Sequence, residues 1–296
     1  MPKFSVITVC KNEEKTIEKT ILSVLNQQYA DVEFIIVDGK STDKTLDIIN
    51  KYRDRIDILI SETDSGVYSA MNKGIQKATG DFLFFLNGND TFKDDFVLKK
   101  VAKIITDYLD AKLVIGNVDF YENGNYKFTN HQEDVLTIFD FQKKFYSHQG
   151  IFYSKSVFEK YGLYNENLRI ISDNLLNAKV LKNNELIVYT KDIISNFTLG
   201  GLSSNLNYKQ LLDKEKKYLH NKMFKYQSVM VRNIISLIKY FLPRVYELYY
   251  KSPIYKTYQL KTVIYDKEKI WWKRYLLFYQ VTKIMLLIYV LQCILF

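Results

Sequence analysis

The sequence predicts an α/β fold: a mostly parallel sheet flanked by helices and followed by a helical C-terminal extension. Two observations predict the sheet. Strand-like and helix-like patterns alternate between residues 4 and 90, and each strand-like run is short, apolar and rich in β-branched residues. Such alternation is typical of parallel, doubly wound sheets. A third observation, a shift beyond about residue 205 to Lys, Tyr and Leu at helical spacing, predicts the extension.

The first half is expected to contain four buried strands joined by helices. The predicted strands are Phe4 to Val9, Val32 to Asp38, Ile56 to Glu62 and Asp81 to Asn87. Apolar residues at helical spacing predict a first connecting helix, with the stripe Ile17, Ile21, Val24 and Leu25. The second begins in Ser41-Thr42-Asp43, a typical helix start, and the third runs from Val67 to Ala78 before Thr79-Gly80.

The pattern after Asp90 is less regular. A helix is predicted from Val97 to Leu109, and Asn123-Gly124 predicts the turn of a hairpin. A strand and a helix are expected in Ile151 to Glu166, a helix in Leu168 to Leu181, and a strand in Glu185 to Ile194.

Polar side chains follow the ends of the predicted parallel strands. They are Asp38, Glu62, Asp64, Asn87 and Asp90. Ligands of such sheets bind outside the carboxyl ends of the strands. The sequence therefore places the candidate site at this edge.

Composition limits the partners and the compartment. The chain has 296 residues and a formal net charge of +9, which indicates either a solvated basic face or an anionic partner. Its basic residues are spread out without a recognition motif, so we do not expect nucleic-acid binding. Two distant cysteines, Cys10 and Cys293, favour a reducing compartment. The N-terminus lacks a signal-peptide pattern, and we expect the body of the protein to be cytoplasmic.

Several ordered motifs make residues 3 to 204 resemble the family 2 glycosyltransferases. The motifs are VITVCKNEE, ILSVLNQQYADVEFIIVDGKSTDKT, ETDSGVYSAMNKGI, GDFLFFLNGND, SHQGIFYSKSVFEKYGLYNENL, ISDNLLNAKVL and GGLS. The resemblance implies the GT-A fold, a Rossmann-like sheet, and is greatest to the branch that builds bacterial polysaccharides. It also implies a nucleotide-sugar donor, with uridine diphosphate as the expected nucleotide, and a glycan or lipid-linked glycan acceptor.

The resemblance assigns the nucleotide-binding residues. Asp38 is expected to hold the nucleoside, with Thr8 nearby, Asp64 lining the same pocket and Asn87 also contacting the nucleotide. A carboxylate at a strand end can accept the imide N–H of uracil or bind a ribose hydroxyl. The alternative for Asp38 is a helix-capping acid, although Ser41 and Asp43 are better placed for capping.

The metal site implied by the resemblance is reduced in this sequence. Family members usually hold Mg²⁺ or Mn²⁺ with a cluster of acids, and the matching positions here are Asn87, Asn89 and Asp90. Asp90, helped by Asn89, is expected to hold the metal, and weaker metal binding is expected because Asn brings no charge. The alternative is an ordinary polar turn.

Asp173 matches the catalytic base of inverting members, which takes a proton from the acceptor hydroxyl. A helix-capping role is the alternative, and both roles are compatible. His148 and Gln149 match a pair found in the polysaccharide branch and could contact the diphosphate or the acceptor; a structural role for His148 is equally open. Lys73 could pair with phosphate or with neighbouring acids.

Gly200 and Gly201 fall in a family motif of a mobile loop that could close over the donor; the alternative is a plain turn. The expected domains are 1–204, catalytic, and 205–296, a membrane-associating extension. Within the first, 1–116 binds the nucleotide sugar and 117–204 carries the acceptor and base residues.

The last 22 residues, Tyr275 to Phe296, carry Lys283 as their only charge and follow a cluster of Trp and basic residues. Such a segment could lie in or span a membrane, or pack as a buried helix. We therefore expect the protein at the cytoplasmic face of the cytoplasmic membrane.

The sequence thus predicts an inverting, metal-dependent glycosyltransferase of polysaccharide synthesis. Two alternatives remain: a polyprenyl-phosphate glycosyltransferase, whose ionised acceptor needs no base, and a non-catalytic homologue that binds nucleotide or a partner protein.

Overall fold

The computed structural model describes residues 1–132, 141, 144–200, 208–224 and 262–265. The chain divides into two compact units, Met1–Ile264 and Tyr265–Phe296. Apart from Tyr265, the second unit lies outside the described residues, and so do the predicted membrane segment and Gly201. Within the described part of the chain, no helix is both long and apolar enough to cross a bilayer.

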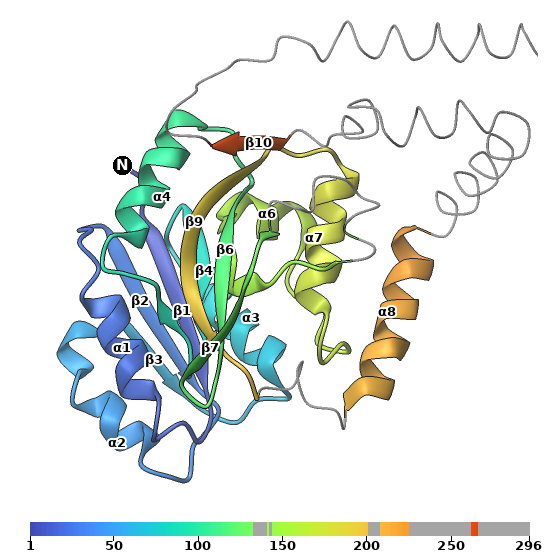
Figure 1. The fold of residues 1–296 in the computed structure, drawn as a ribbon. Helices are drawn as coiled ribbons and strands as arrows, with labels where there is room; N and C mark the ends of the chain where they lie inside the picture. Colours follow the sequence, from blue (N-terminus) through green and yellow to red (C-terminus); the bar gives the residue numbers. More distant parts are fainter. Residues whose placement is uncertain (133–140, 142–143, 201–207, 225–261, 266–296) are drawn as a thin grey trace, which may run out of the picture. The chain divides into compact units, whose positions relative to one another are not determined.

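One mixed sheet forms the centre of the first unit (Figure 1). Its strands are β1 (Phe4–Cys10), β2 (Val32–Asp38), β3 (Ile58–Ser61), β4 (Phe82–Phe85), β5 (Thr91–Phe92), β6 (Leu113–Glu122), β7 (Asn125–Asn130), β8 (Ile151–Ser154), β9 (Ile187–Thr198) and β10 (Thr262–Tyr265). The order across the sheet is β10-β9-β6-β8-β4-β1-β2-β3, with β5 paired to β9 and β7 paired to β6. The predicted strands are confirmed.

The first four long strands run parallel, as the alternating pattern predicts. β1 pairs with β2 and with β4, and β2 pairs with β3, all in parallel register. The pair Cys10 and Asp38 closes the β1–β2 ladder. The carboxyl ends of these strands therefore meet at one edge of the sheet.

The second half of the sheet is not uniformly parallel. β8 lies between β4 and β6 and is antiparallel to both, with Phe152 opposite Phe84 and Val114. β6 and β9 are parallel to each other. The predicted hairpin joins β6 to β7, and its turn residues Asn123 and Gly124 both have positive φ, 52° and 78°, as a tight turn of this kind requires.

Helices cover both faces of the sheet (Figure 1). The longer ones are α1 (Ile17–Leu25), α2 (Thr45–Asn50), α3 (Val67–Lys77), α4 (Val97–Asp107), α6 (Lys155–Tyr161), α7 (Ser172–Lys182) and α8 (Lys209–Met223). The described part of the chain also contains two 3₁₀ turns, η1 (Arg53–Arg55) and η3 (His148–Gly150). The helices expected between residues 17 and 181 are present. In the extension that the sequence predicts to be helical, the described residues form helix α8 and, unlike the prediction, the strand β10, which adds to the sheet beside β9; the rest of the extension lies outside the described residues.

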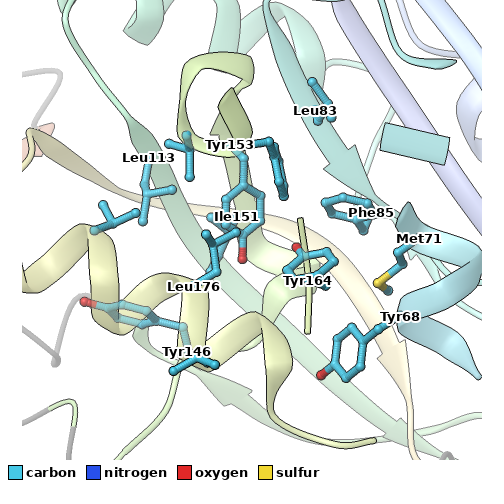
Figure 2. Close-up of a cluster of buried hydrophobic side chains, with 14 of the residues drawn as sticks. Tyr68, Met71, Leu83, Phe85, Leu113, Tyr146, Ile151, Tyr153, Tyr164 and Leu176 are labelled. Atoms are coloured by element: carbon cyan, nitrogen blue, oxygen red, sulfur yellow. The ribbon is translucent and has the colours of Figure 1, made fainter. Parts of the chain in front are cut away.

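A large apolar core lies between the sheet and helices α3, α6 and α7. It takes alternate residues from the strands, such as Leu83 and Phe85 from β4 and Ile151 and Tyr153 from β8. Figure 2 shows part of this core, in which the ring of Tyr164 lies between those of Phe85 and Tyr68. Each fully buried large apolar side chain contributes about 1.5–3 kcal/mol relative to exposure, so this layer fixes α3 and α7 at the edge of the site.

Helix α8 packs on α7 and is fixed by one buried acid. Glu215 is 4% exposed and accepts hydrogen bonds from the backbone amides of Arg169 (2.8 Å), Ile170 (3.0 Å) and Ile171 (3.3 Å). These amides lie just before the first turn of α7, where a negative charge is favoured. The segment that precedes α7 is therefore held from the C-terminal side of the chain.

Candidate active site

The candidate site lies at the carboxyl ends of β1, β2 and β4. Cys10 is the last residue of β1 and lies between the loop that follows β2 and the loop that follows β4. The Gly39 amide donates to the Cys10 carbonyl at 2.8 Å, and a Cβ on Gly88 would lie 2.7 Å from the Cys10 Cβ. A larger residue than glycine at 88 would therefore force the Asn87–Asp90 loop away from β1.

Asp38 occupies the end of β2, as the sequence indicates. Its carboxylate is fully buried and accepts from the Ser41 amide (3.1 Å), the Ser41 hydroxyl and the Ser61 hydroxyl (2.7 Å). The Ser41 hydroxyl in turn accepts from the Asn12 amide at 2.8 Å, which ties Asp38 to the loop after β1. Asp38 is thus a structural acid of the β2 loop as well as the candidate nucleoside residue.

Asp64 lies over the same loop. Its Oδ1 accepts from the Gly66 amide at 2.9 Å, and a Cβ on Gly39 would lie only 2.6 Å from its Oδ2. Thr8 lies on β1 between β2 and β4, and its buried hydroxyl makes no hydrogen bond within the described part of the chain. The structure therefore brings Asp38 and Asp64 together around Gly39, while Thr8 lies beneath them in the sheet.

The Asn87–Asp90 loop follows β4 and is fixed from two sides. The Asp90 carbonyl accepts from the Thr20 hydroxyl at 2.7 Å, and the Asn89 carbonyl accepts from the Thr198 hydroxyl at 2.9 Å. Asp90 Oδ1 accepts from the Thr198 amide at 3.2 Å. The end of β9 thereby holds this loop, although it lies more than a hundred residues later in the chain.

The Asp90 carboxyl is completely buried, and its Oδ2 has no hydrogen-bond partner among the residues that the structure describes. Burial raises the pKa of Asp90 from 3.8 to about 7, although the Thr198 amide and the His148 and Gln149 side chains oppose the rise. A buried oxygen without a partner is costly and calls for an explanation. A cation beside Oδ2 would satisfy it and favour the ionised form.

The residues of this loop fit a divalent cation in part. Asp90 Oδ2 is an available hard oxygen ligand, and the half-exposed Asn89 side chain offers an amide oxygen. Among the described residues, no group of three or more His, Cys, Asp or Glu side chains could hold a metal ion by itself. The remaining ligands would have to come from elsewhere, and a bound diphosphate offers suitable oxygens.

Asp173 lies in the first turn of α7 and is 3% exposed. Its Oδ1 accepts from the Tyr68 hydroxyl at 2.7 Å, and its Oδ2 lies 3.3 Å from the Asn174 side-chain amide. His148 Nδ1 lies 3.4 Å from the same Oδ2. The carboxylate is thus oriented by groups from α3, α7 and η3.

His148 connects the Asp173 carboxylate to the Asn87–Asp90 loop. Its Nδ1 faces Asp173, and its Nε2 lies 3.4 Å from the Asn87 side-chain nitrogen. A neutral imidazole with its proton on Nδ1 can donate toward Asp173 and accept from Asn87 at once. The next residue, Gln149, is buried, and its carbonyl accepts from the Ser195 hydroxyl at 2.6 Å.

The other predicted contact residues lie outside these groups. Lys73 on α3 pairs with Glu62 at 2.9 Å and donates to the Thr63 carbonyl at 2.8 Å, which is the surface pairing that the neighbouring acids suggested. Gly200 follows β9 with φ of 123°, a conformation that favours glycine. Gly201 lies outside the described residues.

Three contributors to the site are absent from the sequence-based prediction. Tyr68 reads as an apolar core residue of α3, and Thr198 as the end of a strand. Glu13 lies near Asp90, close enough for its charge to raise the Asp90 pKa, and its Cγ would lie 3.2 Å from a Cβ on Gly88. Their positions depend on contacts between distant parts of the chain, so no local pattern could reveal them.

The sequence model of the protein family described as "Glycosyl transferase family 2" matches residues 5–163 of this chain, more than half of its length. The chain belongs to glycosyltransferase family 2. A relative from Mycobacterium bovis (strain BCG / Pasteur 1173P2), "PGL/p-HBAD biosynthesis glycosyltransferase", is 32% identical over 218 residues, covering 72% of this chain and 84% of the relative. The family 2 match confirms the enzyme class expected from the motifs, a glycosyltransferase of the branch that serves bacterial polysaccharide synthesis.

Solved structures confirm the GT-A fold of this family 2 enzyme. TarS residues 1–349 from Staphylococcus aureus superpose with a TM-score of 0.57 at 23% identity, covering 66% of this chain and 60% of TarS. The mannosyltransferase PcManGT from Pyrobaculum calidifontis, in complex with GDP-Man and Mn²⁺, gives 0.53 at 16% identity, covering 88% and 84%. Divalent metal is common among such enzymes.

Proposed function

We propose that this family 2 enzyme is an inverting glycosyltransferase that moves a sugar from a uridine diphosphate donor to a hydroxyl of a lipid-linked glycan. The observation that carries the proposal is the buried Asp173 carboxylate, which is oriented by Tyr68 and His148 and linked through Asn87 to the loop after β4. A single oriented carboxylate is what an inverting transfer requires of a base.

The uridine donor is supported by a structural relative. TarS has been solved in complex with UDP and with UDP-GlcNAc. The same fold accepts GDP-Man in PcManGT, so the base of the donor depends on local contacts. In this chain Asp38 and Asp64 surround Gly39 at the end of β2, where a carboxylate can accept the imide N–H of a uracil or bind ribose hydroxyls.

The reaction follows from the placement of these groups. Asp173 accepts the proton of the acceptor hydroxyl while that oxygen attacks the anomeric carbon from the face opposite the diphosphate. The bond to the diphosphate breaks in the same inversion, and the nucleotide diphosphate leaves. Asp90 and Asn89 would hold a Mg²⁺ or Mn²⁺ ion, which neutralises the charge that develops on the leaving group.

His148 is suited to keep Asp173 ready for this role. Its Nδ1 lies 3.4 Å from Asp173 Oδ2, and its Nε2 lies 3.4 Å from the Asn87 side-chain nitrogen. A change at the donor loop can therefore reach the base through one side chain. We assign His148 and Gln149 to the donor side of the site.

The decisive experiment measures nucleotide diphosphate release from a panel of UDP- and GDP-sugars. The purified full chain is assayed with Mn²⁺, Mg²⁺ or EDTA, with membrane extract supplying acceptor. We expect metal-dependent release from one UDP-sugar and loss of at least about a hundredfold in Asp173→Asn. Asp110→Asn, an exposed acid, is the matched control. Full activity of Asp173→Asn would exclude the base and favour a polyprenyl-phosphate acceptor, and binding without turnover would favour a non-catalytic homologue.

The membrane location is a second part of the proposal. Helix α8 has one exposed acid, Asp213. Five of its lysines are exposed: Lys209, Lys214, Lys216, Lys217 and Lys222. Such a basic helix is attracted to anionic cytoplasmic lipid, which would bring the site to a lipid-linked acceptor. Cosedimentation of the full chain with anionic but not with zwitterionic vesicles is expected, and equal recovery with both would contradict it.

A further inference from the structure

Tyr68 contacts two acceptors with one hydroxyl. Its oxygen lies 2.7 Å from Asp173 Oδ1 and 2.7 Å from the carbonyl oxygen of Ile170. A tyrosine hydroxyl has a single hydrogen to donate and can also accept. In any one state it can donate fully to only one of these two oxygens.

The protonation state of Asp173 decides between the two. When Asp173 is ionised, the charge-assisted bond to the carboxylate is the stronger one, and the hydroxyl donates to Oδ1. Once Asp173 has taken a proton on Oδ1, it becomes a donor itself. The Tyr68 oxygen can then accept from Asp173 while its own hydrogen turns to the Ile170 carbonyl.

The second acceptor is held in place independently. The Ile170 and Ile171 amides donate to the buried Glu215 carboxylate of α8, at 3.0 and 3.3 Å. The peptide that presents the Ile170 carbonyl is therefore fixed, and it remains within reach of Tyr68 whichever way the hydroxyl points.

We propose that Tyr68 is a positioning residue for the base, whose hydroxyl donates to ionised Asp173 and turns to the Ile170 carbonyl when Asp173 receives the acceptor's proton. This inference rests on the proposed role of Asp173. Tyr68 is 4% exposed and lies in the core beside Tyr164, so it acts through Asp173 and does not reach substrate (Figure 2).

The surroundings of Asp173 make Tyr68 the group able to do this. The titratable side chains that face the carboxylate are Tyr68 from α3, His148 from η3, Tyr153 from β8 and Tyr164 from the loop before α7. Tyr153 donates to Asn177 Oδ1 at 3.1 Å, and Tyr164 makes no hydrogen bond to Asp173. Burial, followed by the Asp173 charge, raises the pKa of Tyr68 well above 10, so its hydroxyl keeps its hydrogen at working pH.

The test compares Tyr68→Phe with Tyr164→Phe in the full chain. Tyr164 is the matched control because its ring packs on Tyr68 at a centroid distance of 5.3 Å, yet its hydroxyl does not bond to the base. For Tyr68→Phe we expect kcat to fall about tenfold with KM nearly unchanged, since an interaction with the reacting base is lost. Without the donor, the hydrogen bond that favours the charged carboxylate is lost, so the acidic limb of the pH–rate profile should move to higher pH.

The outcomes separate this inference from the proposed function. If Asp173→Asn is inactive and Tyr68→Phe shares the kcat and pH profile of Tyr164→Phe, the inference fails and the base remains. If Asp173→Asn is fully active, the proposed function fails. Thermal melts of both Phe variants show whether a loss of activity follows from unfolding. A tenfold loss of kcat in Tyr68→Phe with an unshifted pH–rate profile would also overturn the positioning role.

Discussion

Replacing Glu215 by Ala should destabilise the α7 end of the molecule by an amount that the structure allows to be worked out. The carboxylate accepts three backbone amides, those of Arg169, Ile170 and Ile171. A buried donor left without a partner costs about 1–3 kcal/mol. Arg169 is exposed and its amide can turn to water, so two amides count. We therefore expect a loss of about 3 kcal/mol in the free energy of unfolding.

The assay is thermal unfolding of the full chain, followed by far-ultraviolet circular dichroism at pH 7.5. For a domain of this size, each kcal/mol corresponds to about 2–4 °C, so Glu215→Ala should lower Tm by about 6–12 °C. Glu215→Gln keeps an acceptor oxygen but loses the charge, and should fall between wild type and Glu215→Ala.

Asp213→Ala is the matched control, because Asp213 lies on the same helix and is exposed. Its Tm should stay within about 1 °C of wild type, as exposed substitutions usually do. A Glu215→Ala variant that also melts within about 1 °C of wild type would refute the reasoning. It would mean that the three amides gain nothing from the carboxylate, and that α8 does not fix the segment before Asp173.

Three further predictions concern the donor side of the site. The pKa of Asp90 is raised to about 7, so a proton competes with a cation for this carboxylate. The increase in Tm that Mn²⁺ and UDP cause together should therefore be large at pH 8 and smaller toward pH 6. It should be lost in Asp90→Ala. Because the pKa of Asp90 is higher in the folded chain, the folded state holds this proton at pH values where the unfolded state has released it. In the absence of metal, the free energy of unfolding of the wild type should therefore fall as the pH rises from about 4 to 7, and that of Asp90→Asn should fall less. Gly39→Ala would place a Cβ 2.6 Å from Asp64 Oδ2, and calorimetric titration should show UDP affinity reduced about tenfold or more; unchanged affinity would place the nucleoside elsewhere.

The sequence predicts the strands, helices and the edge that carries the site because these depend on local patterns. The run FLFF in β4 is apolar throughout, and Asp38 is the last residue of the buried strand β2. The direction of β8 could not be predicted, because a four-residue apolar run carries no sign of whether its neighbours run with it or against it.

The sequence predicted the acidic residues of the candidate site, but it could not predict the side chains that hold those acids and the adjoining backbone in place. Asp173 stands out as an acid at a helix start within a family motif. Tyr68 lies 105 residues away from it in the chain and has the spacing of a core aromatic. Glu215 lies in a helix rich in charge, where an acid is ordinarily at the surface, and only the docking of α8 on α7 shows it to be buried.

The antiparallel strand β8 also has a consequence for how the chain folds. β4 borders β1 on one side, and its other edge is covered only when Phe82 pairs with Ser154, far along the chain. Until that segment has left the ribosome, an apolar strand edge stays open, and open edges invite pairing with other chains. Closing so long a loop before its contacts form is slow. Chaperone dependence and losses to aggregation during expression are therefore expected to trace to the interval between synthesis of β4 and synthesis of β8.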